Sequence, residues 1–422
     1  MFVANNMVSD RRVIREAATV AAAGFAVTVH AIAQRREALP LREEHPDGFT
    51  ILRHRSGLIP PVLPIRPQLL ALLIHPFWCA LAIAAAVART IRIPLAGAAL
   101  LAIRWTSWST LAARAANSAQ ILHAHDLSGA LPAFATLRSN PTATLLYDSH
   151  EVFLESGRWA KSPRFIRRLL ATRLEQPALR RAAALIAVNP QVIEELAKRY
   201  EIPERHVVTY NCPPAWSPEP RGTELRAAIG VDAAAQVVLY HGGFSAHRGL
   251  EELLEAKRDP RLANAHLVFL GYGPLEATLR AAAADPVYGG RVHVMKAVAP
   301  EVLDRWVSGA DVGMCTVLPS TLNHRISTPN KLFESIGAGV PIIASDFTTM
   351  REIVLGDPDG PLGAVCDPTN PHEVASAIHS ILSMSPSDRA ELRARCIRAA
   401  AVRWNWEAQA ARLTELYRSL PL

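Results

Sequence analysis

The stretch Thr328–Asp346, TPNKLFESIGAGVPIIASD, contains the start of a helix, its end and an apolar strand within one short segment. Thr328, Pro329 and Asn330 are typical of a helix start, because proline is favoured in the first turn, where an N–H group would lack an intrahelical partner. The free N–H groups and the positive end of the dipole at such a start favour a bound anion. The sequence therefore predicts a site for a phosphate or diphosphate at this point.

The rest of the stretch continues from this helix into a strand. Glu334 lies one turn after Asn330, where its carboxylate can accept hydrogen bonds from vicinal hydroxyl groups such as those of a ribose. Gly337 and Gly339 predict the end of the helix, and the apolar run Val340 to Ala344 predicts a parallel strand. This helix-to-strand unit predicts an α/β fold.

Strand-like runs alternate with helical runs along the whole chain, which predicts β-α units with parallel sheets. In the first half the predicted strands are Met1–Asn5, Ala26–Ala31, Ile121–Ala124, Leu145–Asp148 and Leu185–Val188. In the second half they are Gln236–Tyr240, His266–Leu270, Val292–Met295, Val312–Cys315 and Pro341–Ala344. The four prolines of Asn211–Arg221 predict the crossing between two domains, and a last helix is predicted from about Trp404 to Leu420.

Composition limits the class of protein and its partners. A chain of 422 residues, half of them apolar, can form two full cores. The net charge of +7 and the pI of about 9.4 favour an anionic partner, such as a nucleotide sugar or an anionic membrane surface. No dense Lys/Arg run interleaved with aromatic residues is present, which argues against nucleic acid. Five scattered cysteines and a start unlike a signal peptide predict a cytoplasmic location.

A second phosphate-binding loop is predicted at Gly242–Gly249, GGFSAHRG, between a strand and a helix. The glycines Gly242 and Gly243 would let the backbone approach a phosphate, and Arg248 could donate two hydrogen bonds to its oxygens. A plain strand-to-helix turn with a solvated arginine is the competing interpretation.

Polar residues also follow two strands of the first half. They are His123, His125 and Asp126 after one strand, and Asp148, His150 and Glu151 after the next. Because the carboxyl ends of parallel strands meet at one edge, these groups are candidates for an active site. Their spacing fits no standard metal-ligand framework, so no metal is predicted, and a satisfied buried histidine remains the alternative for His150.

These motifs resemble the donor-site signature of retaining glycosyltransferases of the GT-B fold, family 4. The resemblance extends over most of the chain, through SDRRVIREAATVAAAGFAVTVHA near the start, HAHD at His123, YDSHE at Tyr147, NCPP at Asn211, GGFSAHRGLEELLEA at Gly242, LVFLGYGP at Leu267 and NWEAQAARLTELY before the end.

The resemblance implies an α/β architecture of two Rossmann-like, doubly wound parallel-sheet domains that face a cleft, with the last helix packed back on the first domain. The expected divisions are an acceptor domain at residues 1–214 with an apolar segment at about 60–110, a nucleotide-sugar donor domain at 215–400, and the returning helix at 401–422.

By the same resemblance, the residues divide into three groups. The expected catalytic residues are His150, Arg248 and Lys331. The expected donor-binding residues are Gly242, Gly243, Gly273, Val298, Thr328, Pro329, Asn330 and Glu334. The expected acceptor or cleft residues are His123, His125, Asp126 and Glu151.

The implied activity is transfer of a sugar from a nucleotide diphosphate donor to a lipid-linked glycan, polysaccharide or small molecule, with retention, without metal or cofactor. Positioning and stabilisation of the departing diphosphate by Arg248 and Lys331 would suffice for catalysis. Two departures keep a non-catalytic relative, binding nucleotide or a partner glycosyltransferase, as the alternative. Ile326 stands where the family has a Glu that contacts the donor sugar, so that role would be lost or taken by Asn323, His324 or a backbone amide. Gly243 stands where the family often has Arg.

The run Gln68–Ala88, QLLALLIHPFWCALAIAAAVA, is the longest apolar segment, and only His75 in it could carry charge. Arg89, Arg92 and Arg104 follow, a basic fringe suited to lipid headgroups. An internal or interfacial helix pair, a monotopic membrane insertion and a membrane span are all compatible with the run. Peripheral association with the inner face of the cell membrane is therefore an open expectation.

Overall fold

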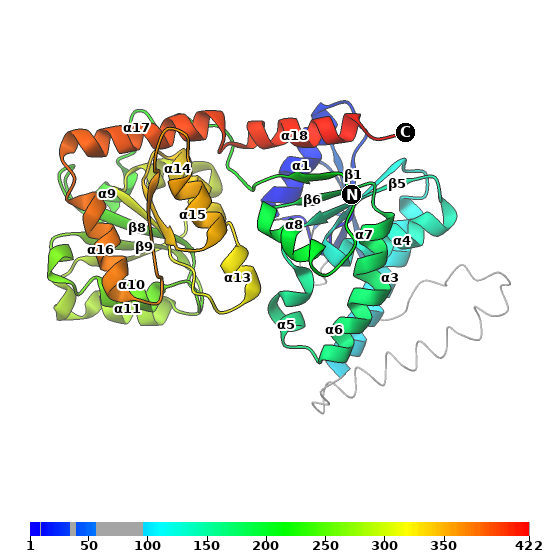
Figure 1. Ribbon diagram of the computed structural model, residues 1–422, viewed down its shortest axis with the longest axis horizontal. Helices are drawn as coiled ribbons and strands as arrows, with labels where there is room; N and C mark the ends of the chain where they lie inside the picture. Colours follow the sequence, from blue (N-terminus) through cyan, green and yellow to red (C-terminus); the bar gives the residue numbers. More distant parts are fainter. Residues whose placement is uncertain (9, 34–38, 56–95, 422) are drawn as a thin grey trace. The chain divides into compact units, whose positions relative to one another are not determined.

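The computed structural model describes residues 1–8, 10–33, 39–55 and 96–421 (Figure 1). Its contacts divide the chain into two compact units. Unit 1 comprises Met1–Ala187, Val192–Thr209 and Arg412–Leu422, and unit 2 comprises Val188–Gln191 and Tyr210–Ala411. The chain thus enters unit 2 briefly at Val188–Gln191, enters it again at Tyr210, just before the proline-rich segment, and returns to unit 1 within the last helix.

Unit 2 contains one fully parallel sheet with the strand order β10-β9-β8-β11-β12-β13. Its strands are β8 (Val237–Gly243), β9 (His266–Tyr272), β10 (Val292–Lys296), β11 (Val312–Cys315), β12 (Ile342–Ser345) and β13 (Gly363–Cys366). Counted from the first strand of the unit, this is the order 3-2-1-4-5-6 of the Rossmann fold. The order reverses between β8 and β11, and ligands of such sheets bind beyond the carboxyl ends of the strands at this point.

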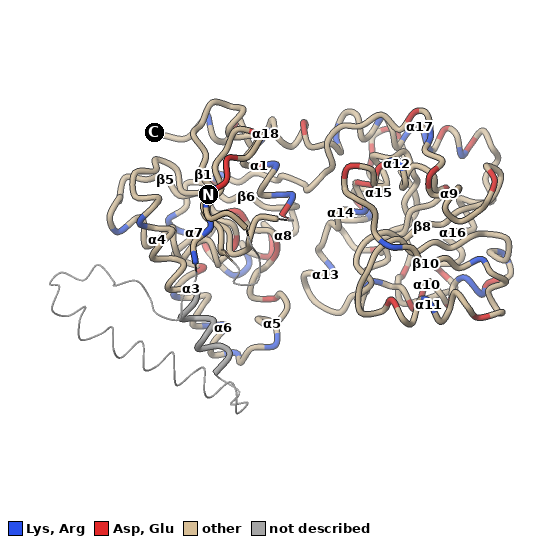
Figure 2. The backbone as a smooth tube through the Cα atoms, turned by 180° about the vertical axis from the view of Figure 1, so that it is seen from behind, with Lys and Arg blue, Asp and Glu red and all other residues tan. Residues whose placement is uncertain are grey.

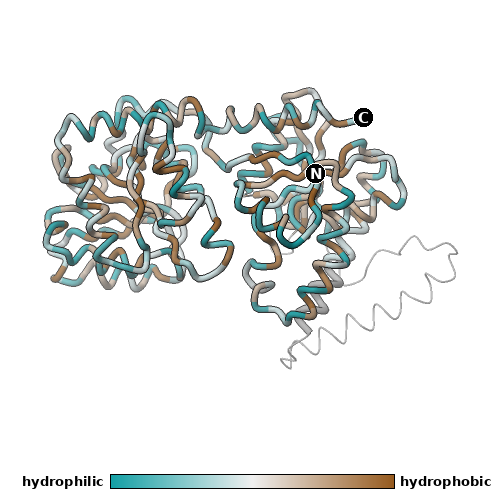
Figure 3. The backbone as a smooth tube through the Cα atoms, viewed as in Figure 1, coloured by the Kyte–Doolittle hydropathy of each residue, from teal (hydrophilic) through white to brown (hydrophobic). Residues whose placement is uncertain are grey.

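Helices cover both faces of this sheet, so consecutive residues of its strands are buried. The strands of unit 2 are largely brown, that is hydrophobic, in Figure 3. The helices of unit 2 are α9 (Glu224–Ala228), α10 (Leu250–Ala256), α11 (Glu276–Ala284), α12 (Leu303–Ser308), α13 (Leu322–Ile326), α14 (Asn330–Gly337), α15 (Thr348–Leu355), α16 (Pro371–Leu382) and α17 (Pro386–Val402), with 3-10 turns at Pro260–Leu262, Pro286–Tyr288 and Pro300–Val302. Helices α10, α11 and α16 pack on one face, and α14, α15 and α17 pack on the other.

Unit 1 has the same plan, built around the first residues of the chain. Its strands are β1 (Thr28–Ala33), β2 (Arg42–Glu44), β3 (Thr50–Arg55), β4 (Ile121–His125), β5 (Thr144–Ser149), β6 (Ala184–Ala187) and β7 (His206–Val208). Phe2 forms parallel bridges to His30 of β1 and to Ala124 of β4 and so joins the two halves of the sheet. All pairs are parallel except that of β2 with β3.

The helices of unit 1 surround this sheet. They are α1 (Arg11–Ala22), α3 (Ala96–Ala115), α4 (Asp126–Ser139), α5 (Gly157–Ala160), α6 (Arg164–Leu170), a π-helical turn (Ala171–Glu175), α7 (Gln176–Arg181) and α8 (Pro190–Ala197), with a 3-10 turn at Phe153–Glu155. The last helix is α18 (Trp406–Arg418). Its residues Leu413, Leu416 and Tyr417 lie in the same core as Val13 and Ala17 of α1, so the predicted return of this helix to the first domain is confirmed.

The two predicted Rossmann-like domains are therefore confirmed, and the strand predictions hold with small shifts at their ends. Strands β2, β3, β7 and β13 were not predicted, because they are short or carry charged residues that hide the apolar pattern. The predicted first strand is reduced to the bridge at Phe2.

The apolar run Gln68–Ala88 lies outside the described residues. Among the residues that the structure describes, no helix combines the length and the apolar character that crossing a membrane requires.

Candidate functional site

The loop after β8 lies at the point where the strand order of unit 2 reverses. Gly249 closes this loop in the left-handed conformation, with φ of 73°, and a Cβ atom there would lie 2.1 Å from the carbonyl oxygen of Thr316, just after β11. Only glycine fits at this position. The backbone of the loop is thereby held against the end of β11.

The loop after β9 packs against the loop after β8. The Phe244 N–H donates to the carbonyl oxygen of Tyr272 at 2.8 Å, and a Cβ atom on Gly273 would lie 2.4 Å from the carbonyl oxygen of Phe244. The predicted donor residues Gly242 and Gly243, which end β8, and Gly273, which follows β9, therefore lie together at the carboxyl edge of the sheet.

Lys331 of α14 reaches this edge from the other side of the strand reversal. Its Nζ lies 3.4 Å from the centroid of the Tyr240 ring, and 3.6 Å from where a Cβ atom on Gly242 would be. The Tyr240 hydroxyl donates to the carbonyl oxygen of Gly243 at 2.9 Å and so fixes the ring. Burial lowers the pKa of Lys331 to about 7.

Arg248, in the loop after β8, provides a second cation at this edge of the sheet. In the described part of the chain its guanidinium group forms no hydrogen bond or ion pair. The neighbouring ring of His247 lies 6.2 Å from that of His324 on α13, and burial together with Arg248 lowers the pKa of His324. Two cations with no carboxylate in ion-pair contact are suited to binding an anion.

Glu334 has a partner that the sequence did not suggest. Its Oε2 lies 3.0 Å from Nε2 of His241, and the Glu334 side chain is 13% exposed. His241 is buried within β8. It was missed because the predicted strand ended at Tyr240 and nothing in the sequence marked the histidine that follows as a partner of Glu334. A carboxylate held in this way keeps a fixed direction toward the edge of the sheet.

The predicted helix start at the end of Thr328–Asn330 is confirmed, because Pro329 is the N-cap of α14 and Asn330 is its first residue. The Asn330 side-chain oxygen accepts a hydrogen bond from Asn211 at 2.9 Å. Val298 follows β10 and packs partly buried on the core. The structure thus places the predicted donor residues of unit 2 at the end of β8, after β9 and β10, and in α14 or just before it.

Ile326, which stands where the resembled family has a Glu, is the last residue of α13. Of the predicted replacements, Asn323 is buried and His324 is held by Ser320, whose hydroxyl lies 2.7 Å from Nδ1 of the ring. His324 is the one whose ring also lies beside the loop that carries Arg248.

In unit 1, Asp148 at the end of β5 connects the predicted histidines. Its Oδ2 lies 3.1 Å from Nδ1 of His125 and 3.2 Å from Nε2 of His150, and its Oδ1 accepts from Arg12 at 2.9 Å. Burial would raise the pKa of Asp148, but Arg12 and His150 outweigh it and hold that pKa well below its usual range.

Arg12 and Glu16 on α1 take part in the same contacts, and the sequence did not predict them. The connected residues, which we call the unit 1 network, are Arg12, Glu16, His123, His125, Asp148 and His150. Arg12 donates to the carbonyl oxygen and the hydroxyl of Thr209 at 2.7 and 2.8 Å and lies 3.0 Å from Glu16. Both side chains are buried, and burial raises the pKa of Glu16 well above its usual range. The sequence offered only a weak signal, an opposite-charge pair at the i,i+4 spacing of a helix.

His150 is the partly exposed member of the network, at 22%. Its backbone N–H donates to Asp126 Oδ1 at 2.9 Å. Although burial alone would lower the pKa of His150, Asp126 and Asp148 outweigh it and raise that pKa to about 10. Asp126 itself adopts a left-handed conformation with φ of 55°, which is uncommon outside glycine and often marks functional positions. Burial and Asp126 raise the pKa of Glu151 to about 7.

His123 and His125 are buried, each with 1% of its side chain exposed. Nδ1 of His123 lies 2.7 Å from the hydroxyl of Tyr417 in α18. Possible ligand atoms of Glu16, His123, His125 and Asp148 lie within 4.8 Å of one another, so these side chains could hold a metal ion. Arg12 already contacts both carboxylates of this group and supplies the positive charge that an ion would bring. The absence of a metal stays a prediction.

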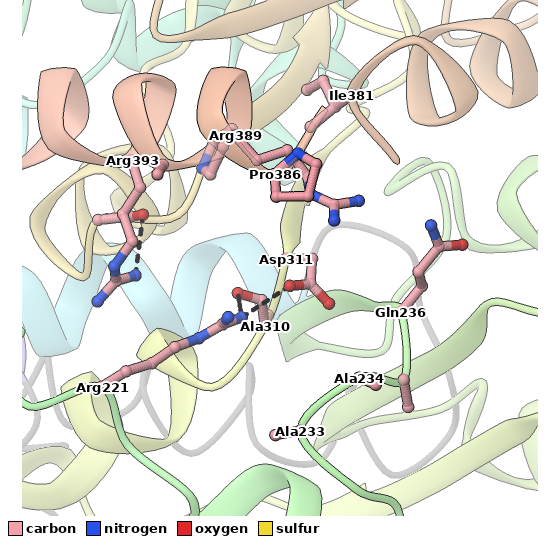
Figure 4. Close-up of a pocket in the computed structure, with 14 residues that line it drawn as sticks. Arg221, Ala233, Ala234, Gln236, Ala310, Asp311, Ile381, Pro386, Arg389 and Arg393 are labelled. Carbon is pink, nitrogen blue, oxygen red and sulfur yellow. Dashed lines mark hydrogen bonds and ion pairs between the residues drawn. The ribbon is translucent and has the colours of Figure 1, made fainter. Parts of the chain in front are cut away.

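A cavity of about 300 Å³ lies at the opposite edge of the unit 2 sheet, near the amino ends of the strands (Figure 4). Asp311, which precedes β11, accepts from Arg221 at 2.9 Å, and Arg393 donates to the carbonyl oxygen of Gly339 at 3.1 Å. These arginines hold the surrounding loops together, and we assign them a structural role.

Comparison with known proteins agrees with the geometry of unit 2. Residues 235–384 match the family model described as glycosyl transferases group 1. The chain is 26% identical over 259 residues to the alpha-D-kanosaminyltransferase of Streptomyces kanamyceticus, covering 59% of this chain and 63% of that protein. It is 28% identical over 253 residues to the D-inositol 3-phosphate glycosyltransferase of Thermobispora bispora, covering 56% of each. The matches span less than two thirds of the length of either relative.

Solved structures resemble the chain over nearly its whole length. Sucrose-phosphate synthase from Thermosynechococcus elongatus has a TM-score of 0.70 at 19% identity, covering 96% of this chain and 92% of that one. HepE from Anabaena, in complex with UDP, has a TM-score of 0.67 at 14% identity, covering 99% of both chains. At these identities the likeness shows the fold, which is GT-B, as the sequence predicted.

Proposed function

We propose that this protein is a glycosyltransferase that moves a sugar from a nucleotide diphosphate donor to an acceptor. The family match in unit 2 and the two named glycosyltransferases support this activity. The observation that carries the proposal is the convergence of Lys331 and Arg248 beside the glycine-containing loop after β8, where the strand order reverses. Two cations and a helix start at one edge suit a diphosphate.

Within this proposal each donor residue has a physical role. Arg248 and Lys331 bind the diphosphate, and Gly242 at the end of β8 and Gly273 after β9 allow its oxygens to approach backbone N–H groups. Glu334, oriented by His241, accepts hydrogen bonds from the ribose hydroxyls. The solved structure of HepE with UDP supports a uridine nucleotide as the first donor to test.

We further propose that transfer retains the configuration at the anomeric carbon and uses no metal. The bond between that carbon and the diphosphate oxygen breaks, the acceptor oxygen bonds to the same face, and the acceptor proton moves to the departing diphosphate. Negative charge grows on the diphosphate, so Arg248 and Lys331 stabilise the transition state more than the ground state. His150, kept protonated by Asp126 and Asp148, is proposed to orient the donor sugar and acceptor.

The acceptor is proposed to be a lipid-linked glycan or another envelope component presented at the inner face of the cell membrane. The apolar run Gln68–Ala88 with its basic fringe supports peripheral membrane association at the level of sequence. Nothing in the proposed chemistry depends on this association.

A panel of nucleotide sugars tests the proposal. We expect one of them to stabilise the protein thermally, and to release its nucleotide diphosphate only when an acceptor or water takes the sugar. NMR of the released or transferred sugar then identifies the anomer, and turnover unchanged by chelators would support the metal-free mechanism. A wild-type protein that binds a nucleotide sugar tightly yet never releases nucleotide with any acceptor would indicate a non-catalytic relative.

A further inference from the structure

Helix α6, Arg164–Leu170, has no buried residue, which is unusual for a helix of a folded domain. Phe165 and Leu169 lie one turn apart and are 71% and 54% exposed. Burying two such side chains would be favourable, so their exposure next to each other points to a partner that covers them.

The charge around these two side chains has one sign. Between Ser156 and Leu174 the sequence has six basic residues and no acidic residue. The Lys and Arg positions of α5 and α6 are blue in Figure 2. The nearest acid before this segment, Glu155, already pairs with Arg167 at 3.4 Å and Arg199 at 2.8 Å. The segment therefore carries a net positive charge, although Arg167 is paired with Glu155.

The cations and the apolar side chains share one side of the helix. Arg164, Phe165, Arg168 and Leu169 are all exposed, at the i, i+1, i+4 and i+5 spacing that places them in one stripe, which we term the α6 face. In the described part of the chain, the guanidinium groups of Arg164 and Arg168 form no hydrogen bond or ion pair. An ordinary solvated face would have mixed charges and few large apolar groups.

We propose that the α6 face docks the protein on the surface of an anionic lipid bilayer. Phe165 and Leu169 insert beside the lipid chains, while Arg164 and Arg168 bind headgroup phosphates. A bilayer is favoured over an acidic protein or a nucleic acid, because it covers apolar groups and neutralises flanking cations at the same surface. This inference rests on the proposed membrane location of the acceptor, but it is independent of the chemistry of transfer.

Three aromatic residues of unit 1 near α6 in sequence or on α3 lie close to one another. The rings of Trp105 on α3 and Trp159 on α5 lie 5.7 Å apart, and both lie near Phe153. Tryptophan is enriched at the interface between lipid and water. Helix α3, which carries Trp105, follows the apolar run Gln68–Ala88 in sequence.

Flotation with vesicles tests the inference. The wild-type protein should float with vesicles of phosphatidylcholine and phosphatidylglycerol and much less with phosphatidylcholine alone. The pair Arg164→Gln and Arg168→Gln should weaken binding about 30-fold at low salt, and the pair Phe165→Ser and Leu169→Ser about 100-fold at any salt. Substitutions at exposed positions should leave the fold intact. The pair Arg398→Gln and Val402→Ser on α17, also exposed, serves as the matched control.

Equal flotation of the wild type and both α6 pairs would overturn the role of α6. No flotation of the wild type, or binding to RNA in place of vesicles, would overturn docking on lipid altogether. Nucleotide-sugar binding measured on the same preparations separates these results from the proposed activity, since the α6 variants should bind donor like the wild type. Loss of donor binding by the α17 control as well would mean that the fold, and not the surface, had changed.

Discussion

Charged side chains gather at the carboxyl ends of the strands in both units, but their pairing differs. In unit 1, Asp148 and Arg12 are buried and contact each other and several further polar groups. In unit 2, Arg248 and Lys331 have no carboxylate in ion-pair contact within the described residues. Buried charges that are paired with each other hold their own geometry, as Arg12 and Asp148 do. Cations without a carboxylate partner leave their electrostatic energy available for a ligand. The difference suggests that unit 1 orients groups, and that unit 2 binds the anion.

The largest effect that would test this comparison is loss of stability on breaking the unit 1 network. Asp148→Asn removes the charge that faces Arg12 and His150 in a buried site. We expect it to lower the free energy of unfolding by about 3–5 kcal/mol. Urea denaturation monitored by fluorescence gives this value.

The control for this prediction is Glu201→Gln, which breaks the exposed pair with Arg180 at 3.0 Å. Such a surface pair contributes about 0–1 kcal/mol. If Asp148→Asn and Glu201→Gln destabilise the protein equally, the unit 1 network is not the rigid element that we describe.

The next largest effect is a loss of turnover when a cation of unit 2 is removed. Arg248→Met should lower kcat about 100-fold, because it removes a cation that faces growing charge on the leaving diphosphate. It should change the free energy of unfolding by less than about 0.5 kcal/mol, since Arg248 has no partner to lose in the described structure. Arg398→Met on the exposed side of α17 should leave kcat unchanged. A destabilised Arg248→Met with normal kcat would reverse the comparison of the two units.

A smaller effect is expected at Glu334. This carboxylate has a partner, His241, like the charges of unit 1, and it is also proposed to bind the donor, like the cations of unit 2. Glu334→Gln should weaken donor binding about tenfold, the equivalent of one charge-assisted hydrogen bond of about 1.5 kcal/mol. Glu391→Gln, at an exposed pair with Arg398, provides the matched control. Donor affinity from calorimetry decides the outcome, and an unchanged value would limit Glu334 to supporting His241.

The sequence predicted unit 2 more completely than unit 1, for a local reason. The phosphate loop and the start of α14 are encoded by glycine, proline and cations within short segments, so Arg248 could be proposed from its place in the loop, and the family resemblance added Lys331. Buried Arg12 and Glu16 could not be found, because nothing near them in sequence shows that this side of α1 faces the ends of β4 and β5. Strand β3 was missed for a similar reason, since its buried Arg53 is neutralised by Glu43 on another strand.

The resemblance placed His123 and His125 among acceptor residues, whereas the structure buries both within the unit 1 network. Strand alternation alone could not distinguish a histidine that faces a ligand from one that faces α1 and Tyr417. Their contact with an acceptor stays a prediction, and the geometry of the network gives them at least the role of orienting Asp148 and, through it, His150.

The most direct test of the account is calorimetric titration of the best-binding nucleotide sugar into the wild type and Lys331→Met at about pH 8. Because burial lowers the pKa of free Lys331 to about 7, its amine is mostly neutral at this pH, and a bound diphosphate should raise that pKa. We therefore predict proton uptake on binding by the wild type, seen as a dependence of the heat on the buffer, and affinity that falls as pH rises above about 7. Lys331→Met should bind about 10- to 100-fold more weakly and take up no proton, while Lys198→Met at an exposed surface pair behaves as the wild type. Equal affinity and equal proton uptake in the wild type and Lys331→Met would contradict the claim that this edge of unit 2 binds the diphosphate.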